Sequence, residues 1–402
     1  MAKIGIFGGS FDPPHLGHVL ALEEFQRKLS LDRVIVIPAG EPPHKQLASG
    51  GASSEHRLQM TRLAVSHLPY AEVSDLELRR EGKSYTALTV EALRQRYPQD
   101  QLFLLMGTDM FLSFSSWYEP HRITAQATLV AAYRMKDQNG RLETCAQRLR
   151  NELGAECVLL ENAFLPYSST GTRAMLTFGC GADYISAEVY DYISRNRLYY
   201  VGVNLIGLDF DTLRSISLSL HDRKRVPHVI GCSDTAGSLA QLYGANYEDA
   251  RRAGILHDIT KALNAQEQLK LCDHYGIILD HFYRENPKLL HAKTGAEVAR
   301  RVFGEDEAVC RAICWHTTGK ADMSILEKIL YLADYVEPNR SFDTVEPLRR
   351  LTFTDLDAAM VLGLQMTMEQ LRGQERLIDP NSIAALRFYQ ERNRDHEIIR
   401  QQ

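Results

Sequence analysis

The stretch GGSFDPPHLGH, residues 8–18, decides the fold of the first half of this chain. A short apolar run, Ile4–Phe7, precedes it and is predicted to be a buried strand, and its two histidines open a predicted helix over Leu16–Leu29. Histidines at positions i and i+3 share one helix face, and the loop before them brings backbone N–H groups to the same helix N-terminus. We therefore predict a polyphosphate site there, in which the imidazoles neutralise charge on a reacting phosphorus.

Apolar runs alternate with helical patterns from residue 1 to about 200. This alternation predicts an α/β domain, a parallel sheet covered by helices. Ligands of such sheets bind at the carboxyl ends of the strands, where residues 8–18 are expected to lie. Helices such as Ser54–Leu68 and Tyr85–Tyr97 lie between further predicted strands at Val34–Ile37, Leu102–Met106, Leu129–Ala132 and Val158–Leu160.

The pattern changes after residue 203, where strand-like runs become rare and amphipathic helical patterns follow one another. This half is predicted to be all-α. The most plausible junction is Val201–Asn204, which gives two predicted domains, residues 1–202 and residues 203–402. The predicted helices cover residues 227–243, 247–257, 264–275, 289–303, 306–316, 322–335, 354–372 and 382–394.

Length and composition restrict the class of protein. At roughly 150 residues per domain, 402 residues predict two or three domains. A net charge of -5 without a block of Lys and Arg argues against a nucleic-acid partner. The seven cysteines form no C-x-x-C pair, so we expect reduced thiols and a cytoplasmic protein. We expect no signal peptide and no membrane span, whereas a homo-oligomer stays open.

Three further segments follow predicted strands or open a helix. Pro42-Pro43-His44-Lys45 follows the second strand and Gly107-Thr108-Asp109 follows the strand Leu102–Met106. Ser168–Arg173 then opens a helix, with hydroxyls that cap it and an arginine suited to bidentate phosphate binding. Plainer readings stay open, because a Ser/Thr run is commonly only an N-cap, Asp109 would also serve as a cap, and Trp117 would also serve as core.

With these segments, residues 1 to about 200 resemble the bacterial nicotinate-mononucleotide adenylyltransferases, which belong to the nucleotidyltransferase superfamily with the H-x-G-H signature. The signature here is His15-Leu16-Gly17-His18. Glu77, Ser84-Tyr85-Thr86, Trp117 and the Ser-Ser-Thr run narrow the resemblance to the nicotinate branch. Thr172, where an aliphatic residue is usual, and Leu88, where Asp is frequent, depart from the family pattern.

The resemblance implies a Rossmann-like nucleotidyltransferase fold and the transfer of AMP from ATP to nicotinate mononucleotide, with Mg²⁺ bridging the triphosphate. His15, His18, Lys45 and Arg173 would carry the catalysis, by positioning and charge neutralisation. ATP would be bound by Gly8, Gly9, Ser10, Phe11, His15, His18, Ser169, Thr170 and Arg173. The nicotinate nucleotide would be bound by His44, Lys45, Tyr85, Thr86, Gly107, Asp109 and Trp117, with the pyridine ring stacked on the tryptophan.

A second constellation lies in the helical half. The order His228, His257-Asp258, His291, His316, Asp334 places potential ligands on separate predicted helices. Singly, each has an ordinary explanation: a surface pair, a helix cap or a filled core edge. Together they favour a metal site of nitrogen and oxygen donors, typical of iron, manganese or zinc. Such a metal makes a bound water a nucleophile and clamps a phosphate.

The same order resembles the HD phosphohydrolase superfamily. The segments Ala253–Lys261, Trp315–Gly319 and Leu332–Arg340 are similar to bacterial HD-type symmetrical diadenosine tetraphosphatases. The resemblance implies a di-metal centre, iron or manganese, that splits diadenosine tetraphosphate into two ADP, with Asp258 as bridging and catalytic ligand and Lys261 and Arg340 as phosphate contacts. A domain that senses nucleotides without hydrolysis, or that hydrolyses another nucleotide, stays open. The implied ligands are His228, His257, Asp258, His291, His316 and Asp334.

Overall fold

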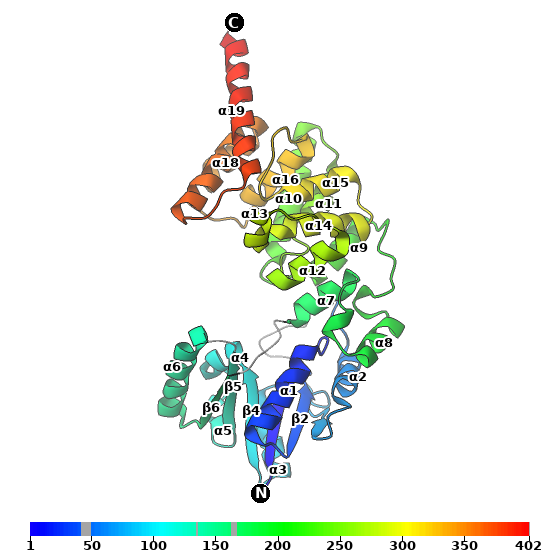
Figure 1. Cartoon of the computed structure of the whole chain (residues 1–402), viewed down its shortest axis with the longest axis vertical. Helices are drawn as coiled ribbons and strands as arrows, with labels where there is room; N and C mark the ends of the chain where they lie inside the picture. The colour runs from blue at the N-terminus through cyan, green and yellow to red at the C-terminus, as the bar shows by residue number, and fades with distance from the viewer. Residues whose placement is uncertain (42–49, 134–135, 162–166, 402) are drawn as a thin grey trace. The chain divides into compact units, whose positions relative to one another are not determined.

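The chain folds into two compact units, Met1–Gly202 and Val203–Gln402. They are seen in a computed structural model that describes residues 1–41, 50–133, 136–161 and 167–401 (Figure 1). Among these residues, no helix is long and apolar enough to cross a membrane. All seven cysteines are free thiols.

The first unit is an α/β domain around one parallel sheet. Within the described residues, six strands pair in the order β3-β2-β1-β4-β5-β6. The strand order therefore reverses between β1 and β4, the topological switch point at which ligands of such sheets bind. The strands are β1 (Lys3–Gly9), β2 (Arg33–Pro38), β3 (Ala71–Val73), β4 (Gln101–Gly107), β5 (Thr128–Tyr133) and β6 (Cys157–Glu161).

Helices connect these strands, as parallel pairing requires. The longer ones are α1 (Leu16–Leu29), α2 (Ser54–Val65), α3 (Thr86–Arg96), α6 (Lys136–Leu153), α7 (Ser169–Thr177) and α8 (Ala187–Arg195). Short helical turns complete the unit: α4 (Thr108–Leu112), η1 (Phe114–Ser116), α5 (Pro120–Thr124), η2 (Ala182–Tyr184) and η3 (Leu198–Tyr200).

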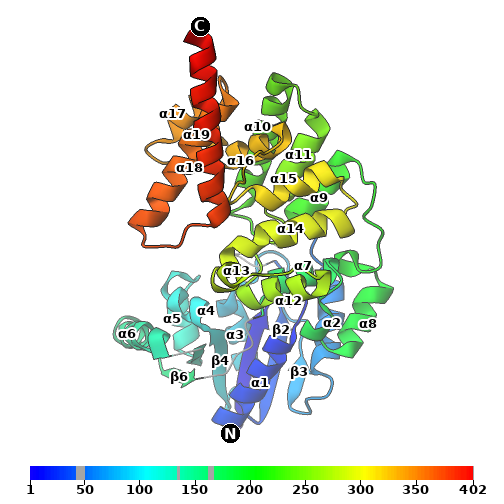
Figure 2. The same cartoon turned by 45° about the horizontal axis from the view of Figure 1, so that its top comes forward.

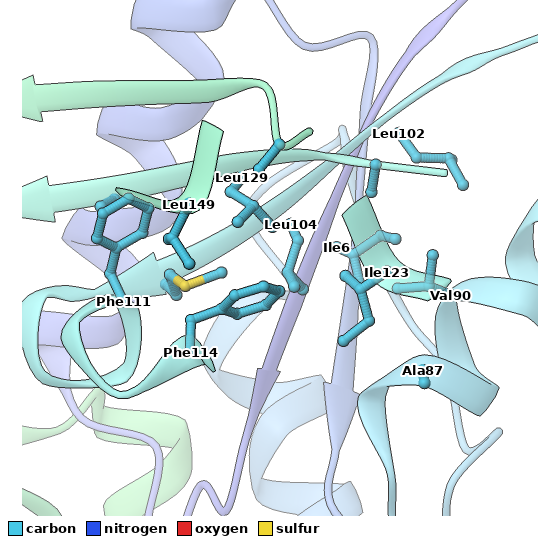
Figure 3. Packing of buried hydrophobic residues seen from close by; sticks show 14 of the residues in the cluster. Ile6, Ala87, Val90, Leu102, Leu104, Phe111, Phe114, Ile123, Leu129 and Leu149 are labelled. Carbon is cyan, nitrogen blue, oxygen red and sulfur yellow. The ribbon is translucent and has the colours of Figure 1, made fainter. Parts of the chain in front are cut away.

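The core of this unit follows from the alternation of side chains along each strand. Every second residue of the central strands, such as Ile4 and Ile6 of β1, points to one face. There these residues meet apolar side chains of α3, the α4–η1 segment, α5 and α6 (Figure 3). Phe7 of β1 instead packs against Phe25 of α1 and Phe11. The sheet is thus covered on both faces, and its free edge for ligands is the carboxyl end of the strands.

The second unit is all-α. Its central helices α10, α11, α14, α15 and α16 pack against one another (Figure 2). The helices are α9 (Phe210–Ser219), α10 (Val226–Tyr243), α11 (Tyr247–Leu256), α12 (Ala265–Tyr275), α13 (His281–Glu285), η4 (Pro287–Leu289), α14 (Leu290–Arg301), α15 (Glu307–Trp315), α16 (Ile325–Val336), α17 (Val345–Thr352), α18 (Leu356–Gly373) and α19 (Pro380–Gln401).

The predicted fold class is confirmed: a parallel α/β sheet domain precedes a helical domain. The predictions did not include β3, which has three residues, nor the helices α6, α8, α9 and α17. Two predicted helix ends are corrected: α11 stops at Leu256 and α15 at Trp315, so His257 and His316 lie just beyond a helix. Each of these histidines bonds through Nδ1 to a carbonyl three residues back, at Gly254 and Ile313, in place of continued helical pairing.

Candidate active sites in the two units

The first candidate site is a cavity of about 880 Å³ at the carboxyl edge of the sheet. The loops after β1 and β4, the two strands at the switch point, contribute to its wall. Glu77 and the Ser84–Thr86 segment add another part of the wall, and Ser168 and Ser169 line it as well. Ser168 caps α7 by accepting a hydrogen bond from the N–H of Gly171, so this wall is also a helix N-terminus.

The two histidines of the H-x-G-H loop lie against each other at the start of α1. Their rings stack with centroids 3.7 Å apart, and His15 is the N-cap residue of the helix. The N–H of His15 donates to Nδ1 of His18 at 3.1 Å. Because Nδ1 of His18 accepts, the proton of the neutral ring belongs on Nε2. Both rings line the cavity, where imidazole N–H groups suit a phosphate.

Aromatic side chains line the cavity in the region of Tyr85 and Thr86. Tyr118 stacks on Tyr85 with ring centroids 4.3 Å apart, and both rings line the cavity. Trp117 lies on Phe114 at 5.2 Å and is packed against the hydrophobic core, while it also faces the cavity. A planar ring would find stacking partners here. Sequence analysis had not singled out Tyr118.

The predicted nucleotide-binding residues divide into three groups. His44 and Lys45 lie outside the described residues. Phe11, Thr170 and Arg173 are described but are not among the residues that line the cavity. The remaining ones do line it: Gly8, Gly9, Ser10, His15, His18, Tyr85, Thr86, Gly107, Asp109, Trp117 and Ser169.

Arg173, predicted as a phosphate contact, bonds to Asp12 in this structure. Its side chain is buried, and Nη1 donates to the backbone carbonyl of Asp12 at 2.6 Å and lies 3.4 Å from Asp12 Oδ2. The hydroxyl of Tyr199 donates to Oδ1 of the same aspartate at 2.7 Å. A buried guanidinium requires a nearby carboxylate, and Asp12 provides it. In this structure Arg173 therefore holds the H-x-G-H loop.

The second candidate site gathers four imidazoles in the helical unit. Residue exposures are 7% for His228, 0% for His257, 2% for His291 and 1% for His316. The Nε2 atoms of His228 and His257 are 3.3 Å apart, and those of His291 and His316 are 3.2 Å apart. The two pairs meet at one carboxylate, Asp258.

The Asp258 carboxylate lies between the two pairs. Its Oδ2 is 3.4 Å from Nε2 of His257, and its Oδ1 is 3.2 Å from Nε2 of His291. Asp334 completes the first group, with Oδ1 3.1 Å from Nε2 of His228. Among the described residues, Asp258 Oδ1 is buried and accepts no hydrogen bond. The structure thus brings together all six residues predicted as metal ligands.

Each of the four imidazoles is oriented by a hydrogen bond of its Nδ1 atom. Nδ1 of His257, His291 and His316 donates to the carbonyls of Gly254, Lys288 and Ile313, at 2.7, 2.6 and 2.7 Å. Since a carbonyl only accepts, Nδ1 carries the proton and Nε2 of the neutral ring presents a lone pair. This arrangement fixes the tautomer of a metal-binding histidine.

The fourth imidazole is oriented by a carboxylate instead. Nδ1 of His228 donates to Oε1 of Glu337 at 3.0 Å. Glu337 is buried and is itself held through Oε2 by the backbone and side chain of Asn339. A Cβ at Gly231 would collide with Oε2 of Glu337, so a side chain there would displace this carboxylate. Sequence analysis gave Glu337 no role, although it lies in the quoted segment Leu332–Arg340.

Three cationic side chains contact the two carboxylates. Arg225 donates through Nε to Asp258 Oδ2 at 2.7 Å, Lys261 Nζ lies 3.9 Å from Asp258 Oδ1, and Arg340 donates to Asp334 Oδ1 at 2.6 Å. Their side chains are partly exposed, unlike the histidines. Lys261 and Arg340 were predicted phosphate contacts. Arg225 was missed, because in the sequence it is one of three adjacent basic residues that precede a helix.

The donor set fits a metal centre. Paired Nε2 lone pairs at about 3.3 Å repel each other unless a cation, either a proton or a metal ion, lies between them. Burial lowers the pKa of His316 to about 4, so this ring is neutral at neutral pH. Burial opposes ionisation of Asp258, but the attraction of His257 outweighs it and holds the pKa of the carboxyl well below its usual range. Imidazole nitrogens around an ionised carboxylate form a donor set suited to iron, manganese or zinc.

Comparisons with known proteins give a match for each of the two units. Residues 6–175 match the cytidylyltransferase-like family model, and residues 225–339 match the HD domain model. The chain is 38% identical over 199 residues to a probable nicotinate-nucleotide adenylyltransferase of Carboxydothermus hydrogenoformans, which covers 49% of this chain and 98% of that protein. A protein of the same description from Thermus thermophilus is 48% identical over 132 residues, 33% of this chain and 69% of that protein.

Among solved structures, an HD superfamily hydrolase involved in NAD metabolism from Clostridium acetobutylicum is 35% identical to this chain. The match covers 46% of this chain and 98% of that one, with a TM-score of 0.45. The first unit is thus a nucleotidyltransferase-type domain and the second carries an HD domain. Through its N-terminal half, the chain belongs to the nicotinate-nucleotide adenylyltransferase family.

Proposed function

We propose that the first unit transfers AMP from ATP to nicotinate mononucleotide and so forms deamido-NAD. The observation that carries this proposal is that one cavity of about 880 Å³ is lined by both the His15–His18 pair and the Tyr85–Tyr118 stack. The imidazoles suit a phosphate and the aromatic rings suit a pyridine. The nicotinate-nucleotide adenylyltransferase relatives support the same substrates.

The proposed reaction depends mainly on the positioning of its two substrates. A phosphate oxygen of nicotinate mononucleotide bonds to the α-phosphorus of ATP, and the bond between that phosphorus and the β-phosphate oxygen breaks, releasing pyrophosphate. His15 and His18 stabilise the charge on the phosphoryl oxygens, while Ser169 and the N-terminus of α7 favour the anionic triphosphate. Mg²⁺ would neutralise the triphosphate when bound. Trp117 and Tyr118 hold the pyridine ring, and Asp109, which lines the cavity, would contact the ribose or the pyridine nucleotide.

This proposal is tested by incubating the purified chain with ATP, Mg²⁺ and either nicotinate or nicotinamide mononucleotide. We expect deamido-NAD and pyrophosphate in equal amounts, with a higher kcat/KM for the nicotinate form. Product only from the nicotinamide form would overturn the acceptor assignment, and no product from either would overturn the reaction.

We propose that the second unit is a metal-dependent phosphohydrolase that splits diadenosine tetraphosphate into two ADP. The observation that carries it is the Asp258 carboxylate between two pairs of Nε2 atoms, which supports a centre of two metal ions. His228, His257 and Asp334 would hold one ion, His291 and His316 the other, and Asp258 would bridge them. Bound metal activates water and stabilises charge on both attacking and leaving oxygens.

The protein's own groups prepare the site for a polyphosphate. Water oxygen becomes bonded to one of the two central phosphorus atoms, and the bridging P–O bond between the central phosphates breaks. Arg225, Lys261 and Arg340, released from the carboxylates that metal engages, would contact the flanking phosphates. The histidines of the centre are buried, whereas the three cationic side chains beside it are partly exposed.

A nucleotide sensor without hydrolysis is the second candidate. The complete ligand set favours an enzyme over a sensor. Incubation with diadenosine tetraphosphate and Fe²⁺ or Mn²⁺ discriminates between them. ADP alone supports symmetrical hydrolysis. ATP with AMP would contradict the symmetrical reaction, and an altered transferase rate without cleavage would support sensing.

A side reaction of the proposed transferase would form the substrate of the proposed hydrolase. If ATP takes the place of the acceptor, its terminal phosphate attacks the α-phosphorus of a second ATP and yields diadenosine tetraphosphate with pyrophosphate. We propose that the second unit removes this by-product. A chain with an inactivated HD site should then accumulate diadenosine tetraphosphate during transferase turnover, and absence of accumulation would contradict the link.

A further inference from the structure

Arg57 is a buried arginine outside the cavity that contacts two of the loops around it. It lies on α2, is 0% exposed, and is the largest fully buried side chain among the described residues. Its Nη1 donates to the carbonyl of Ser10 at 2.8 Å, and its Nη2 donates to the carbonyl of Gly40 at 3.3 Å. Ser10 follows β1 and Gly40 follows β2. One rigid guanidinium therefore spans the ends of two neighbouring strands.

Burying a guanidinium costs free energy, because the charged group loses its hydration. Burial lowers the pKa of Arg57, and Asp12 is the nearby anion whose attraction opposes this. Asp12 is already engaged by Arg173, Tyr199 and the N–H of Ala52. Apolar residues commonly replace buried charges without loss of stability. The two carbonyl contacts, rather than stability, are therefore the specific feature that an arginine provides.

Gly40 extends the connection to a third segment. Its N–H donates to Oγ of Ser84 at 2.9 Å. A Cβ at residue 40 would lie 2.6 Å from the carbonyl oxygen of Glu77, so the loops meet as closely as backbone allows. Through Gly40, Arg57 is linked to the Ser84–Thr86 wall of the cavity.

The connected loops line different parts of the same cavity. Ser10 belongs to the wall with His15 and His18, and Ser84 belongs to the wall with Tyr85. A trans peptide directs C=O and N–H to opposite sides, so the bond from Arg57 to the Ser10 carbonyl turns the N–H of Phe11 away from Arg57. The guanidinium thus fixes both the spacing and the orientation of the loop after β1.

We infer that Arg57 is a positioning residue that sets the distance between the phosphoryl and pyridine ends of the cavity. This inference rests on the proposed transferase function of the first unit. Each end is able to bind its own substrate without Arg57, but in-line attack requires both substrates in fixed register. Misplacement by about 1 Å is enough to slow a reaction about 100-fold.

The test is Arg57→Lys, in which one ammonium group cannot reproduce the guanidinium's fork between two loops. We expect kcat of deamido-NAD synthesis to fall about 10- to 100-fold. KM for ATP and for nicotinate mononucleotide should each stay within about twofold, as expected when an interaction specific to the transition state is lost. Arg62→Lys, an exposed position on the same helix, is the matched control and should keep wild-type kinetics.

Gly40→Ala gives a second, independent variant, because it separates the loops without changing a charge. It should show the same loss of kcat with nearly unchanged KM, measured on folded protein after titration of active sites. Wild-type kcat in either variant would overturn the inference, as would losses explained entirely by a smaller folded fraction. If the wild type itself forms no deamido-NAD, the proposed function fails instead. Fluorescence titration with each nucleotide then tests Arg57 separately: unequal weakening of one nucleotide in Arg57→Lys would contradict a spacing role.

Discussion

The two candidate sites are built in opposite ways. In the first unit, loops at the carboxyl edge of a sheet surround a large cavity. Arg57 and Arg173, which are not among the residues that line the cavity, donate hydrogen bonds to backbone carbonyls of the loop after β1. In the second unit, side chains at helix ends converge on one buried carboxylate. The first site depends on where the backbone runs. The second depends on which side chains meet.

This difference has consequences for stability. Buried charged and polar ligands that face one another destabilise a fold until a cation satisfies them, so a metal bound in the second unit would contribute folding free energy. The first site faces a cavity of about 880 Å³. We therefore expect changes at the first site to alter rates, and changes at the second site to alter metal affinity, stability and rate together.

The largest effect is expected for Asp258→Asn. Removing the negative charge of the proposed bridging ligand would remove several kcal/mol of transition-state stabilisation by the metal centre. Hydrolysis of diadenosine tetraphosphate should therefore fall about 1,000-fold or more. The metal content, measured by elemental analysis, should fall with it. Asp273→Asn, an exposed position on α12, is the control and should retain both. Full hydrolysis with normal metal content in Asp258→Asn would refute the assignment of the bridge.

A somewhat smaller effect is expected for His18→Ala in the other unit. Loss of one donor to a developing phosphoryl charge costs about 100- to 1,000-fold in kcat. The melting temperature should change little, because the ring faces a cavity. His67→Ala removes an exposed imidazole from the same unit and should leave kcat unchanged. A loss in His18→Ala matched by an equal loss in His67→Ala would point to general damage.

Glu337→Gln tests how the second site is oriented. The amide keeps the shape of the side chain but removes the carboxylate that accepts from Nδ1 of His228. Loss of such a partner lowers metal affinity about 10- to 100-fold. The measurement is titration of chelator-treated protein with Mn²⁺, with Glu369→Gln on the surface of α18 as the control. Equal affinities for Glu337→Gln and the control would show that the contact does not orient the ligand.

The smallest effect concerns His221, which is buried in the second unit. Burial lowers the pKa of His221 to about 4, compared with about 6.5 for an unfolded chain. Between these values the unfolded chain binds the additional proton, so stability rises with pH and is lost as pH falls below about 6.5. His221→Phe should reduce the slope of unfolding free energy against pH by at most about 1.4 kcal/mol per unit. Urea unfolding of metal-free protein measures it.

His274→Phe, at an exposed position on α12, provides the comparison for this titration. Its slope should match that of the wild type, because this substitution leaves the buried His221 in place. An unchanged slope in His221→Phe would show that His221 does not titrate with unfolding.

Much of the fold could be predicted because long, periodic segments carry strong signals. The alternation of apolar runs and helical patterns predicted the α/β sheet domain, and the later amphipathic helices predicted the helical one. β3 has three half-buried residues, too few for a pattern. α6 is largely polar, although Leu142, Cys145, Ala146 and Leu149 have the spacing of a buried helix face and could have revealed it.

The sites were predictable where residue type decides the chemistry. The six metal-ligand candidates could be predicted because histidines and aspartates in that order have few other uses. The structure brings them together. Arg57 and Glu337 were not predictable in the same way, since one Arg or Glu on a helical pattern usually lies on the surface. Arg173 was predicted as a phosphate contact, and its bond to Asp12, 161 residues earlier in the chain, becomes visible only in the fold. Such contacts between distant segments become visible only in three dimensions.

The central claim, that one chain carries two independent sites, is tested most directly by assaying His18→Ala and Asp258→Asn in both reactions. We predict that His18→Ala loses deamido-NAD synthesis and still converts diadenosine tetraphosphate into two ADP at the wild-type rate. We predict the reverse pattern for Asp258→Asn. If either variant loses both activities while it remains folded, the two reactions depend on a shared site and the account is contradicted.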